Sequence, residues 1–299
     1  MEKVLEIKNV SKSYGKIKAL SQVSFEVPEG SVFGILGPNG SGKTTMLSII
    51  LDVLKSDAGD YYWFGSPGAD KDLRKKIGSL LETPNFYHYL SGRNNLQVTR
   101  SISGRGTEEE LDEVLQKVNL FDRRNSRFSS YSLGMKQRLA VAAALLGEPR
   151  VLVLDEPTNG LDPVGIAEMR QLVIELRKKG HTIIIASHLL DEVEKICTHV
   201  AILKKGTLVT TGAVDDVLVD EDIVELGSVD TNRLQTVLNS FTAATKISVN
   251  ENYIQLTFPK GKADLETLNR FCFDNGIVLN HLILKKKRLE ARFFELTNN

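Results

Sequence analysis

The spacing of hydrophobic residues in the first part of the chain predicts two kinds of strand. Apolar and polar residues alternate at 23–27, which is typical of a strand with one exposed face. Val32–Leu36 and Val151–Asp155 are almost continuously apolar, and Ile183–Ala186 is a shorter run of the same kind. Runs like these are typical of strands that are buried on both faces, so we expect all three to lie inside a sheet.

Helical patterns follow these buried runs. Thr44–Val53 comes after the first run and Ala167–Lys179 after the second, which predicts an α/β fold with helices covering a largely parallel sheet. Residues 90–146 are mostly helical in pattern and form a helical insert. Lys204-Lys205-Gly206 indicates a turn between two short strands. One helix of the insert has an apolar face with spacing i, i+3, i+4, i+7, formed by Leu111, Val114, Leu115 and Val118.

The pattern changes after about residue 220, and a second domain begins there. We place the first domain at 1–218 and the second at 220–299. The order of the later elements predicts a small α+β unit of the ferredoxin-like kind, with a hairpin turn at 250–252. These elements are a strand at Ile223–Leu226, a helix at Thr231–Phe241, strands at Lys246–Val249 and Tyr253–Phe258, a helix at Asp264–Asn275, a strand at Ile277–Leu284 and a closing helix at Leu289–Leu296.

Composition and charge describe an ordinary globular protein. The 299 residues allow two domains, and 38 basic residues balance 38 acidic ones, so no overall field attracts nucleic acid or anionic lipid. Cys197 and Cys272 lie far apart, and we expect two ordinary thiols in a reducing compartment rather than a zinc site or a disulfide. The longest apolar stretch, near Leu139–Leu146, is much shorter than the ~20 residues of a membrane span, which favours a cytoplasmic protein.

A phosphate-binding loop follows the first buried strand. Residues 37–44 fit the pattern G-x-x-x-x-G-K-[ST], between a strand and a helix as that motif requires. Glycines let the backbone turn its N–H groups toward phosphate, Lys43 reaches the terminal phosphates, and Thr44 is a ligand for Mg²⁺. We expect ATP to bind at Gly37, Pro38, Asn39, Gly40, Ser41, Gly42, Lys43, Thr44 and Thr45.

Two acidic residues end the second buried strand and narrow the chemistry. In the run VLVLDE, Asp155 is positioned to orient Mg²⁺ and Glu156 to polarise an attacking water. Four apolar residues bury the approach to this pair, which argues against a merely solvated edge. The combination predicts an ATP hydrolase with Glu156 as the general base.

In this order the motifs resemble those of the nucleotide-binding subunits of ABC transporters, over about residues 1–218. The stretch SLGMKQ at 132–137 is similar to the family signature, in which Ser132 caps a helix that runs to Leu146. The resemblance implies that this helix aims its N-terminus at the γ-phosphate held by an opposite subunit. It also implies an adenine-stacking Tyr14, an interface loop at 159–162, and a γ-phosphate contact from His188. The nucleotide ligands implied in this way are Tyr14, Ser132, Gly134, Gln137 and Asp162.

Two positions depart from the family pattern. Glu82 stands where the family usually has Gln, and it adds a carboxylate to the Mg²⁺ and the attacking water, so we include it among the metal and catalytic residues. Leu133 replaces the first glycine of the signature and removes the backbone freedom of that glycine. Glu82 together with YSLGMKQRL at 131–139 is similar to the branch of exporters associated with bacitracin and lantibiotic self-protection.

The resemblance implies a head-to-tail homodimer that drives export through a separate integral-membrane subunit, at the cytoplasmic face of the membrane. Phe86, Tyr87, Leu90 and Asn95 suggest a groove for a helix of that subunit, or else internal packing of the insert. The basic run at 285–288 is either a solvated turn or a contact with lipid head groups or RNA. Two alternatives stay open: an ATPase that acts on ribosomes or DNA, disfavoured by the single cassette and zero net charge, and a membrane regulator that moves no substrate.

Overall fold

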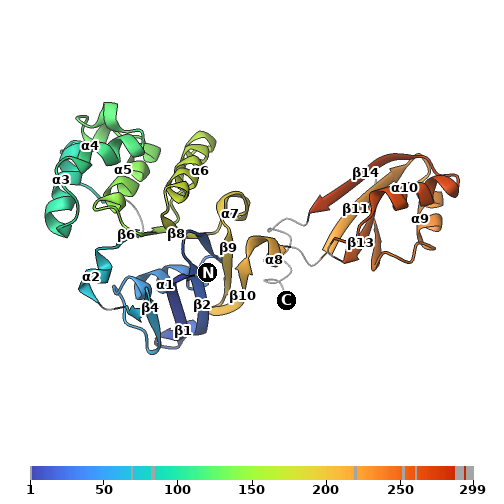
Figure 1. The fold of residues 1–299 in the computed structure, drawn as a ribbon, viewed down its shortest axis with the longest axis horizontal. Helices are drawn as coiled ribbons and strands as arrows, with labels where there is room; N and C mark the ends of the chain where they lie inside the picture. The colour runs from blue at the N-terminus through green and yellow to red at the C-terminus, as the bar shows by residue number, and fades with distance from the viewer. Residues whose placement is uncertain are drawn as a thin grey trace. The chain divides into compact units, whose positions relative to one another are not determined.

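The computed structural model describes residues 2–68, 70–81, 85–218, 221–250, 253–259, 261–286 and Phe293. The chain forms two compact units, Met1–Val214 and Asp215–Asn299. Figure 1 shows the elements of both units, and each unit is described by itself.

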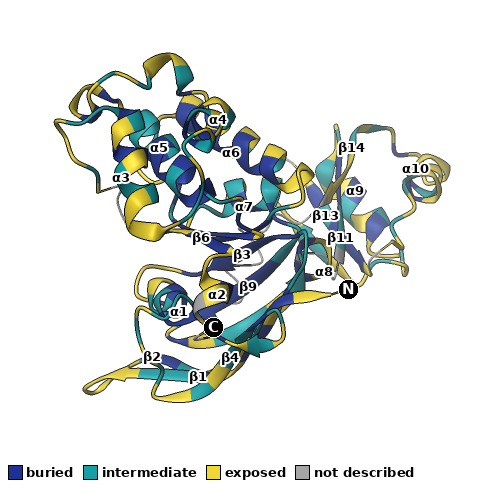
Figure 2. Cartoon of the chain, turned by 60° about the vertical axis from the view of Figure 1, so that its left-hand side comes forward, coloured by how far each residue is buried: buried dark blue, intermediate teal, exposed yellow. Residues whose placement is uncertain are grey.

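A six-stranded sheet forms the centre of the first unit, in the order β10-β9-β3-β8-β7-β6. Neighbours in this sheet are parallel except for β10, which runs antiparallel to β9. Every residue of β3, β7 and β8 is buried, so the three expected interior strands are confirmed; Figure 2 shows β3 in the colour of buried residues. The strands are β3 (Val32–Leu36), β6 (Ile77–Leu80), β7 (Val151–Asp155), β8 (Thr182–Ser187), β9 (His199–Lys204) and β10 (Thr207–Ala213).

A second, antiparallel sheet packs in the same unit, in the order β2-β1-β4-β5. The alternation expected at 23–27 is confirmed within β2, where buried and exposed residues take turns. The other three strands had no clear sequence signal. The strands are β1 (Lys3–Tyr14), β2 (Ile17–Pro28), β4 (Ala58–Trp63) and β5 (Ser66–Pro67).

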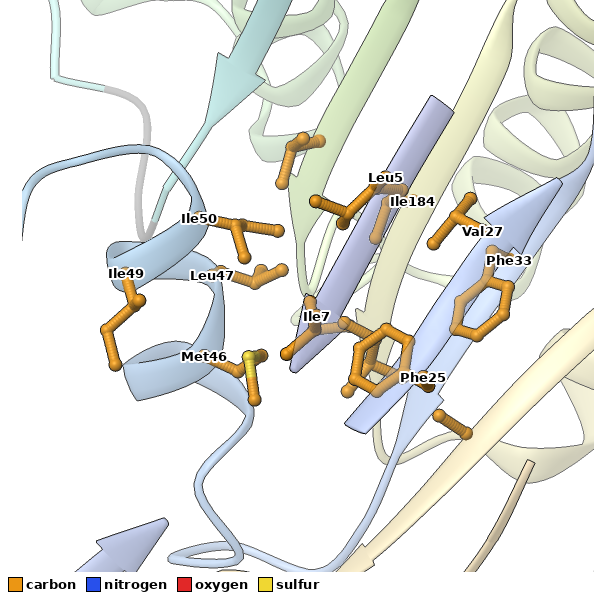
Figure 3. Packing of buried hydrophobic residues seen from close by; sticks show 14 of the residues in the cluster. Leu5, Ile7, Phe25, Val27, Phe33, Met46, Leu47, Ile49, Ile50 and Ile184 are labelled. Carbon is orange, nitrogen blue, oxygen red and sulfur yellow. The ribbon is translucent and has the colours of Figure 1, made fainter. Parts of the chain in front are cut away.

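One hydrophobic cluster joins both sheets to the helix α1 (Lys43–Ile50). Met46 and Leu47 of α1 face Ile7 of β1, as Figure 3 shows. The indole Nε1 of Trp63 donates a 2.8 Å hydrogen bond to the carbonyl of Ile50, the last residue of α1. The helix that begins at the phosphate loop is therefore fixed at its far end by a fully buried side chain.

The expected helical insert consists of three main helices. The apolar face predicted for the middle helix of the three is confirmed, because Leu111, Val114, Leu115 and Val118 are all buried. These helices are α3 (Gly92–Ser103), α4 (Glu110–Lys117) and α5 (Leu133–Leu145); the shorter elements α2 (Lys71–Arg74), η1 (Phe121–Arg123) and η2 (Phe128–Ser130) lie before and between them in the chain.

Two helix boundaries in the first unit lie away from their expected positions. The helix α6 (Pro163–Lys178) begins four residues early, because the Asp162 carboxylate accepts a 2.8 Å hydrogen bond from the Gly165 N–H. The helix α1 ends three residues early, where Asp52 has a left-handed backbone with φ 59°. The remaining helix of the first unit is α7 (Leu190–Ile196), and α8 (Val214–Leu218) begins at the residue where the first unit ends.

The second unit has the ferredoxin-like topology that the sequence predicts. Its antiparallel sheet has the order β12-β13-β11-β14, in which each of two β-α-β pairs is split by a strand of the other pair. The hairpin centre at 251–252 and all of the expected closing helix except Phe293 lie outside the described residues. The elements are β11 (Glu221–Ser228), α9 (Thr231–Leu238), β12 (Lys246–Val249), β13 (Ile254–Pro259), α10 (Leu265–Asp274) and β14 (Leu279–Lys286).

Candidate nucleotide site

Three adjacent parallel strands bring the chemical motifs to one edge of the main sheet. In β3 and β8, Leu36 pairs with Ser187, and in β7 and β8, Asp155 pairs with Ala186. The segments that follow these strands therefore emerge side by side at their carboxyl ends, where open α/β sheets bind ligands. The phosphate loop, the acidic pair and the segment with His188 meet there.

Two glycines of the phosphate loop are needed for its shape. A Cβ atom on Gly37 would lie 2.5 Å from the carbonyl oxygen of Leu203, and one on Gly42 would lie 2.5 Å from that of Ala19. Gly42 also has φ 105° and is the N-cap of α1, without a side-chain cap. The first N–H groups of the helix are thus left for an anion, as in other phosphate-binding loops.

Lys43 is buried at the centre of the site, although its side chain carries a charge. Its Nζ donates a 2.9 Å hydrogen bond to the carbonyl of Gly37, and it lies 3.6 Å from the Oε1 atom of Glu156. A buried ammonium needs such partners because burial removes its hydration. The same group can donate to phosphate oxygens that enter the loop.

Thr44 and Asp155 form a pair of hard oxygen donors. The Thr44 hydroxyl donates a 2.9 Å hydrogen bond to the Oδ2 atom of Asp155, which is buried at the end of β7. A hydroxyl and a carboxylate at this distance fit the ligand preferences of Mg²⁺, so the residues present suit the metal. Glu82, the other expected metal ligand, lies outside the described residues.

Glu156 and His188 make a direct contact. The Nδ1 atom of His188 lies 2.8 Å from Oε2 of Glu156, so the two carboxylate oxygens of Glu156 face different partners, His188 and Lys43. Glu156 has φ 47°, which is strained for a residue with a side chain, and its N–H donates to the carbonyl of Ala186 at 2.9 Å. The backbone thus holds this carboxylate in one orientation.

A cavity of about 650 Å³ opens beside these groups. Seven of its lining residues are expected site residues, and four were missed. The missed residues come from β2 and the β9–β10 turn, where nothing in the local sequence signals a ligand. The lining residues are Ile17, Lys18, Ala19, Asn39, Gly40, Gly42, Lys43, Thr44, Thr45, Glu156 and Lys205.

Tyr14 stands at the end of β1, paired in the hairpin with the cavity residue Ile17, and half of its surface is exposed. Asp57 holds this end of β1, because its carboxylate accepts 2.7 Å hydrogen bonds from Lys12 Nζ and from the Ser13 N–H. The Lys12 hydrogen bond is the largest cause of a lowered pKa for Asp57. The ring is therefore accessible, on an anchored strand beside the cavity.

The signature residues are not among the described residues that line the cavity. Ser132 caps α5 as expected, accepting a 3.3 Å hydrogen bond from the Met135 N–H, and Leu133 is the first helical residue, with 45% of its surface exposed. A helical backbone at that position does not need glycine. A Cβ atom on Gly160 would lie 3.0 Å from Leu133, so the 159–162 loop passes close to the helix start. Gln137 is buried, unlike Ser132, so its expected nucleotide contact stays a prediction.

The comparisons with known proteins agree with this geometry. The family model described as ABC transporter matches residues 20–159. The chain is 39% identical to the uncharacterized ABC transporter ATP-binding protein YhcH of Bacillus subtilis (strain 168), over 99% of this chain and 97% of that protein. The chain therefore belongs to the ABC transporter ATP-binding proteins, and it is an ATPase that binds ATP and ADP.

Two further relatives confirm the branch that the signature suggested. The bacitracin transport ATP-binding protein BcrA of Enterococcus faecalis is 34% identical over 99% of this chain and 97% of its own length. The lantibiotic transport ATP-binding protein SrtF of Streptococcus pyogenes is 39% identical over 69% of this chain and 89% of its own length. The likeness to BcrA thus runs through both units.

A solved structure shares the fold of the cassette. It is the dimeric post-hydrolysis state of the ATP-binding cassette MJ0796 bound to ADP and Pi, 28% identical, with a TM-score of 0.63. The match covers 70% of this chain and 98% of that one. In the part of this chain that the structure describes, no helix is long and apolar enough to cross a membrane.

Proposed function

We propose that this subunit works as a head-to-tail pair of copies that hydrolyses ATP to drive export through a separate integral-membrane subunit, at the cytoplasmic face of the membrane. The observation that carries the proposal is the meeting of Lys43, Glu156 and His188 at the end of three parallel strands. The relationship to BcrA and SrtF favours peptide antibiotics as the exported class, with drugs or lipids as further candidates.

In this mechanism the phosphate loop and Lys43 hold the phosphates, and Tyr14 stacks on adenine. Thr44 and Asp155, with Glu82, would hold Mg²⁺, which neutralises phosphate charge when it is bound. Glu156 accepts the proton of the attacking water and is held by its 2.8 Å contact with His188, and His188 contacts the γ-phosphate.

The pair of copies would complete each site from opposite sides. Ser132 and Gly134 lie at the N-terminal end of α5, where backbone N–H groups and the helix dipole favour an anion. No residue of α5 is among the described residues that line the cavity of its own chain, so this end is available to a nucleotide bound by a second copy. Asp162 caps α6 at the adjacent loop, which we place at the same interface.

A pair of exposed aromatic residues suits the contact with the membrane subunit. Tyr87 and Tyr89 have 49% and 69% of their surfaces exposed, with ring centroids 5.8 Å apart. The buried Asn95 side chain accepts from the Tyr87 N–H at 2.8 Å and donates to its carbonyl at 3.1 Å. Phe86 packs edge-on against Phe128 at 5.3 Å. This segment therefore presents fixed apolar surface that a partner helix can cover.

The decisive experiment is ATP turnover by Glu156→Gln. We expect turnover to fall about 10²- to 10⁴-fold, because the general base is lost while Lys43 and the loop are kept. ATP should still bind, and gel filtration with ATP should show dimers. Turnover equal to that of the unchanged protein would refute the role of Glu156.

The membrane partner is tested by co-purification from membranes. Detergent extracts should contain a stable integral-membrane chain together with this subunit, and Tyr87→Ala with Tyr89→Ala should release it while ATP binding is kept. Co-purification of ribosomes or nucleic acid instead would contradict the transport role.

A further inference from the structure

The turn between β9 and β10 has a lysine, Lys205, at a position with a left-handed backbone. Lys204 and Thr207 pair across the hairpin, and the two residues between them, Lys205 and Gly206, have φ 47° and 80°. Two positive φ values in a two-residue hairpin define a type I′ turn, which prefers Asn, Asp or Gly at both positions. A lysine in the left-handed region costs about 1 kcal/mol, so this turn is not optimised for its own conformation.

The turn is fixed against the phosphate loop. The Gly206 N–H donates a 3.0 Å hydrogen bond to the carbonyl of Ser41, and the Gly206 carbonyl accepts a 2.8 Å hydrogen bond from the Ser21 N–H. A Cβ atom on Gly206 would lie 2.7 Å from the carbonyl oxygen of Ala19. The backbone of Lys205 is therefore held in place at the rim formed by β2 and the phosphate loop.

Lys205 lines the same cavity as Lys43. Among the described residues, no carboxylate oxygen comes within 4.0 Å of its ammonium group. Glu156, the acidic residue in the lining, is already in contact with Lys43 and His188. A lysine that faces a phosphate-binding cavity without an acidic partner has a favourable interaction to make with an anion that enters the cavity.

We infer that Lys205 is a further nucleotide-binding residue, whose ammonium group contacts the phosphate chain of the bound nucleotide. This inference rests on the proposed site in that it places the nucleotide in the cavity. The turn is hydrogen-bonded to Ser21 and Ser41 and not to the Glu156–His188 pair. Lys205 therefore serves binding and not the hydrolytic step, and it supports ATP and ADP alike.

The substitution Lys205→Asn separates charge from turn geometry, because asparagine is favoured in the left-handed region. We expect Lys205→Asn to weaken the binding of ADP and of a non-hydrolysable ATP analogue by the same factor, about three- to tenfold, in calorimetric titrations. In turnover assays the loss should lie in KM and not in kcat, because an interaction made equally with substrate and transition state changes only KM. The difference should shrink as salt is raised.

Lys205→Arg is the matched control, since it keeps the charge and should bind both nucleotides within about twofold of the unchanged protein. Unchanged affinity in Lys205→Asn would overturn the inference, and so would equal losses in Lys205→Asn and Lys205→Arg, which would point to the turn alone. Failure of the proposed site looks different, because Lys43→Ala would then bind ATP normally as well.

Discussion

The two units place their charged groups in opposite ways. In the first unit Lys43, Glu156 and His188 come from segments that follow parallel strands, and they meet beside an open cavity. In the second unit Glu225 lies in the middle of β11, where its Oε1 atom accepts from Lys285 at 2.7 Å and from Gln255 at 2.9 Å. One arrangement leaves interactions for a ligand, and the other uses them within the protein.

The difference follows from sheet topology. The carboxyl ends of parallel strands all lie at the same edge of the sheet. Polar residues that follow these strands therefore gather at that edge, beyond the paired part of the sheet, and have no cross-strand partner there. In an antiparallel sheet, side chains of neighbouring strands stand opposite one another, and register pairs Glu225 with Gln255 and with Ile283. Lys285, part of the basic run that raised a lipid or RNA contact, is thereby held in an ion pair within its own sheet.

The largest expected effect comes from Lys43→Ala, which tests whether the first unit's charges serve a ligand. Lys43 is buried, and its ammonium group donates a 2.9 Å hydrogen bond to the Gly37 carbonyl of the loop, so its loss removes the charge that holds the phosphates. We expect ATP affinity in calorimetric titrations to fall at least about 100-fold, or about 3 kcal/mol.

Lys75→Ala is the control, because Lys75 is an exposed lysine of the same unit whose ion pair with Asp72 is surface-exposed. It should leave ATP affinity unchanged. If Lys43→Ala bound ATP as tightly as Lys75→Ala, the charge of Lys43 would not serve to bind a ligand, and the proposed difference between the two units would fail for the first unit.

An intermediate effect, on stability, is expected from Arg105→Met. This substitution removes a charge of the first unit whose hydrogen bonds are made within the protein. The Arg105 guanidinium donates hydrogen bonds to the carbonyls of Ile77, Ala144 and Leu146 at 2.5 to 3.0 Å, and so ties the segment after α3 to β6 and to the end of α5. Burial lowers the pKa of this side chain, and the nearby charge of Glu110 opposes that shift. We expect the first unit to lose about 2–4 kcal/mol of unfolding free energy, because three carbonyls lose a charged donor.

The single tryptophan, Trp63, is buried in the first unit, so its fluorescence during urea unfolding measures that unit. Arg270→Met, which breaks an exposed pair with Glu266 in the second unit, should leave the Trp63 transition unchanged. If the Trp63 transition of Arg105→Met were also unchanged, the Arg105 hydrogen bonds would contribute nothing to the stability of the first unit.

Sequence alone identified the parts of the site that depend on local pattern. The strands, the phosphate loop and Glu156 were predictable, because buried runs and glycine spacing act over a few residues. Lys205 and Ile17 were not, since they reach the cavity through contacts between β2, the loop and a turn more than 160 residues later. The start of α6 was misplaced for a simpler reason, namely that the Asp162 cap was assigned only to the interface loop.

The Glu225 cluster was equally hidden from sequence, because its members come from three strands. Lys285 from β14 and Gln255 from β13 reach Glu225 only through the register of the sheet, and His281 lies 3.6 Å away on the same face. No local motif marks such a set. These polar residues nevertheless predict a pH-dependent stability of the second unit.

The smallest expected effect comes from Glu225→Gln, which tests whether the second unit's charges are structural. The pKa of Glu225 is held below its ordinary value of 4.5, chiefly by the hydrogen bond from Lys285. A lowered folded pKa means that the carboxylate stabilises the unit above pH 4.5 and that this stability is lost as pH falls through the folded value. At pH 7 we expect Glu225→Gln to cost about 1–2 kcal/mol, and to cost less once the pH falls below the lowered pKa of the folded protein.

Pulsed hydrogen exchange in urea, measured on peptides from β11 and β13, reports the second unit while Trp63 reports the first. The β11 and β13 transitions of Glu225→Gln should shift to lower urea at pH 7 and approach those of the unchanged protein in acid, with the Trp63 transition and ATP affinity unaltered. A variant as stable as the unchanged protein at pH 7 would show that the cluster is not structural. A loss of ATP affinity in Glu225→Gln would contradict the proposal that the first unit alone binds the nucleotide, because a residue of the second unit would then affect that binding.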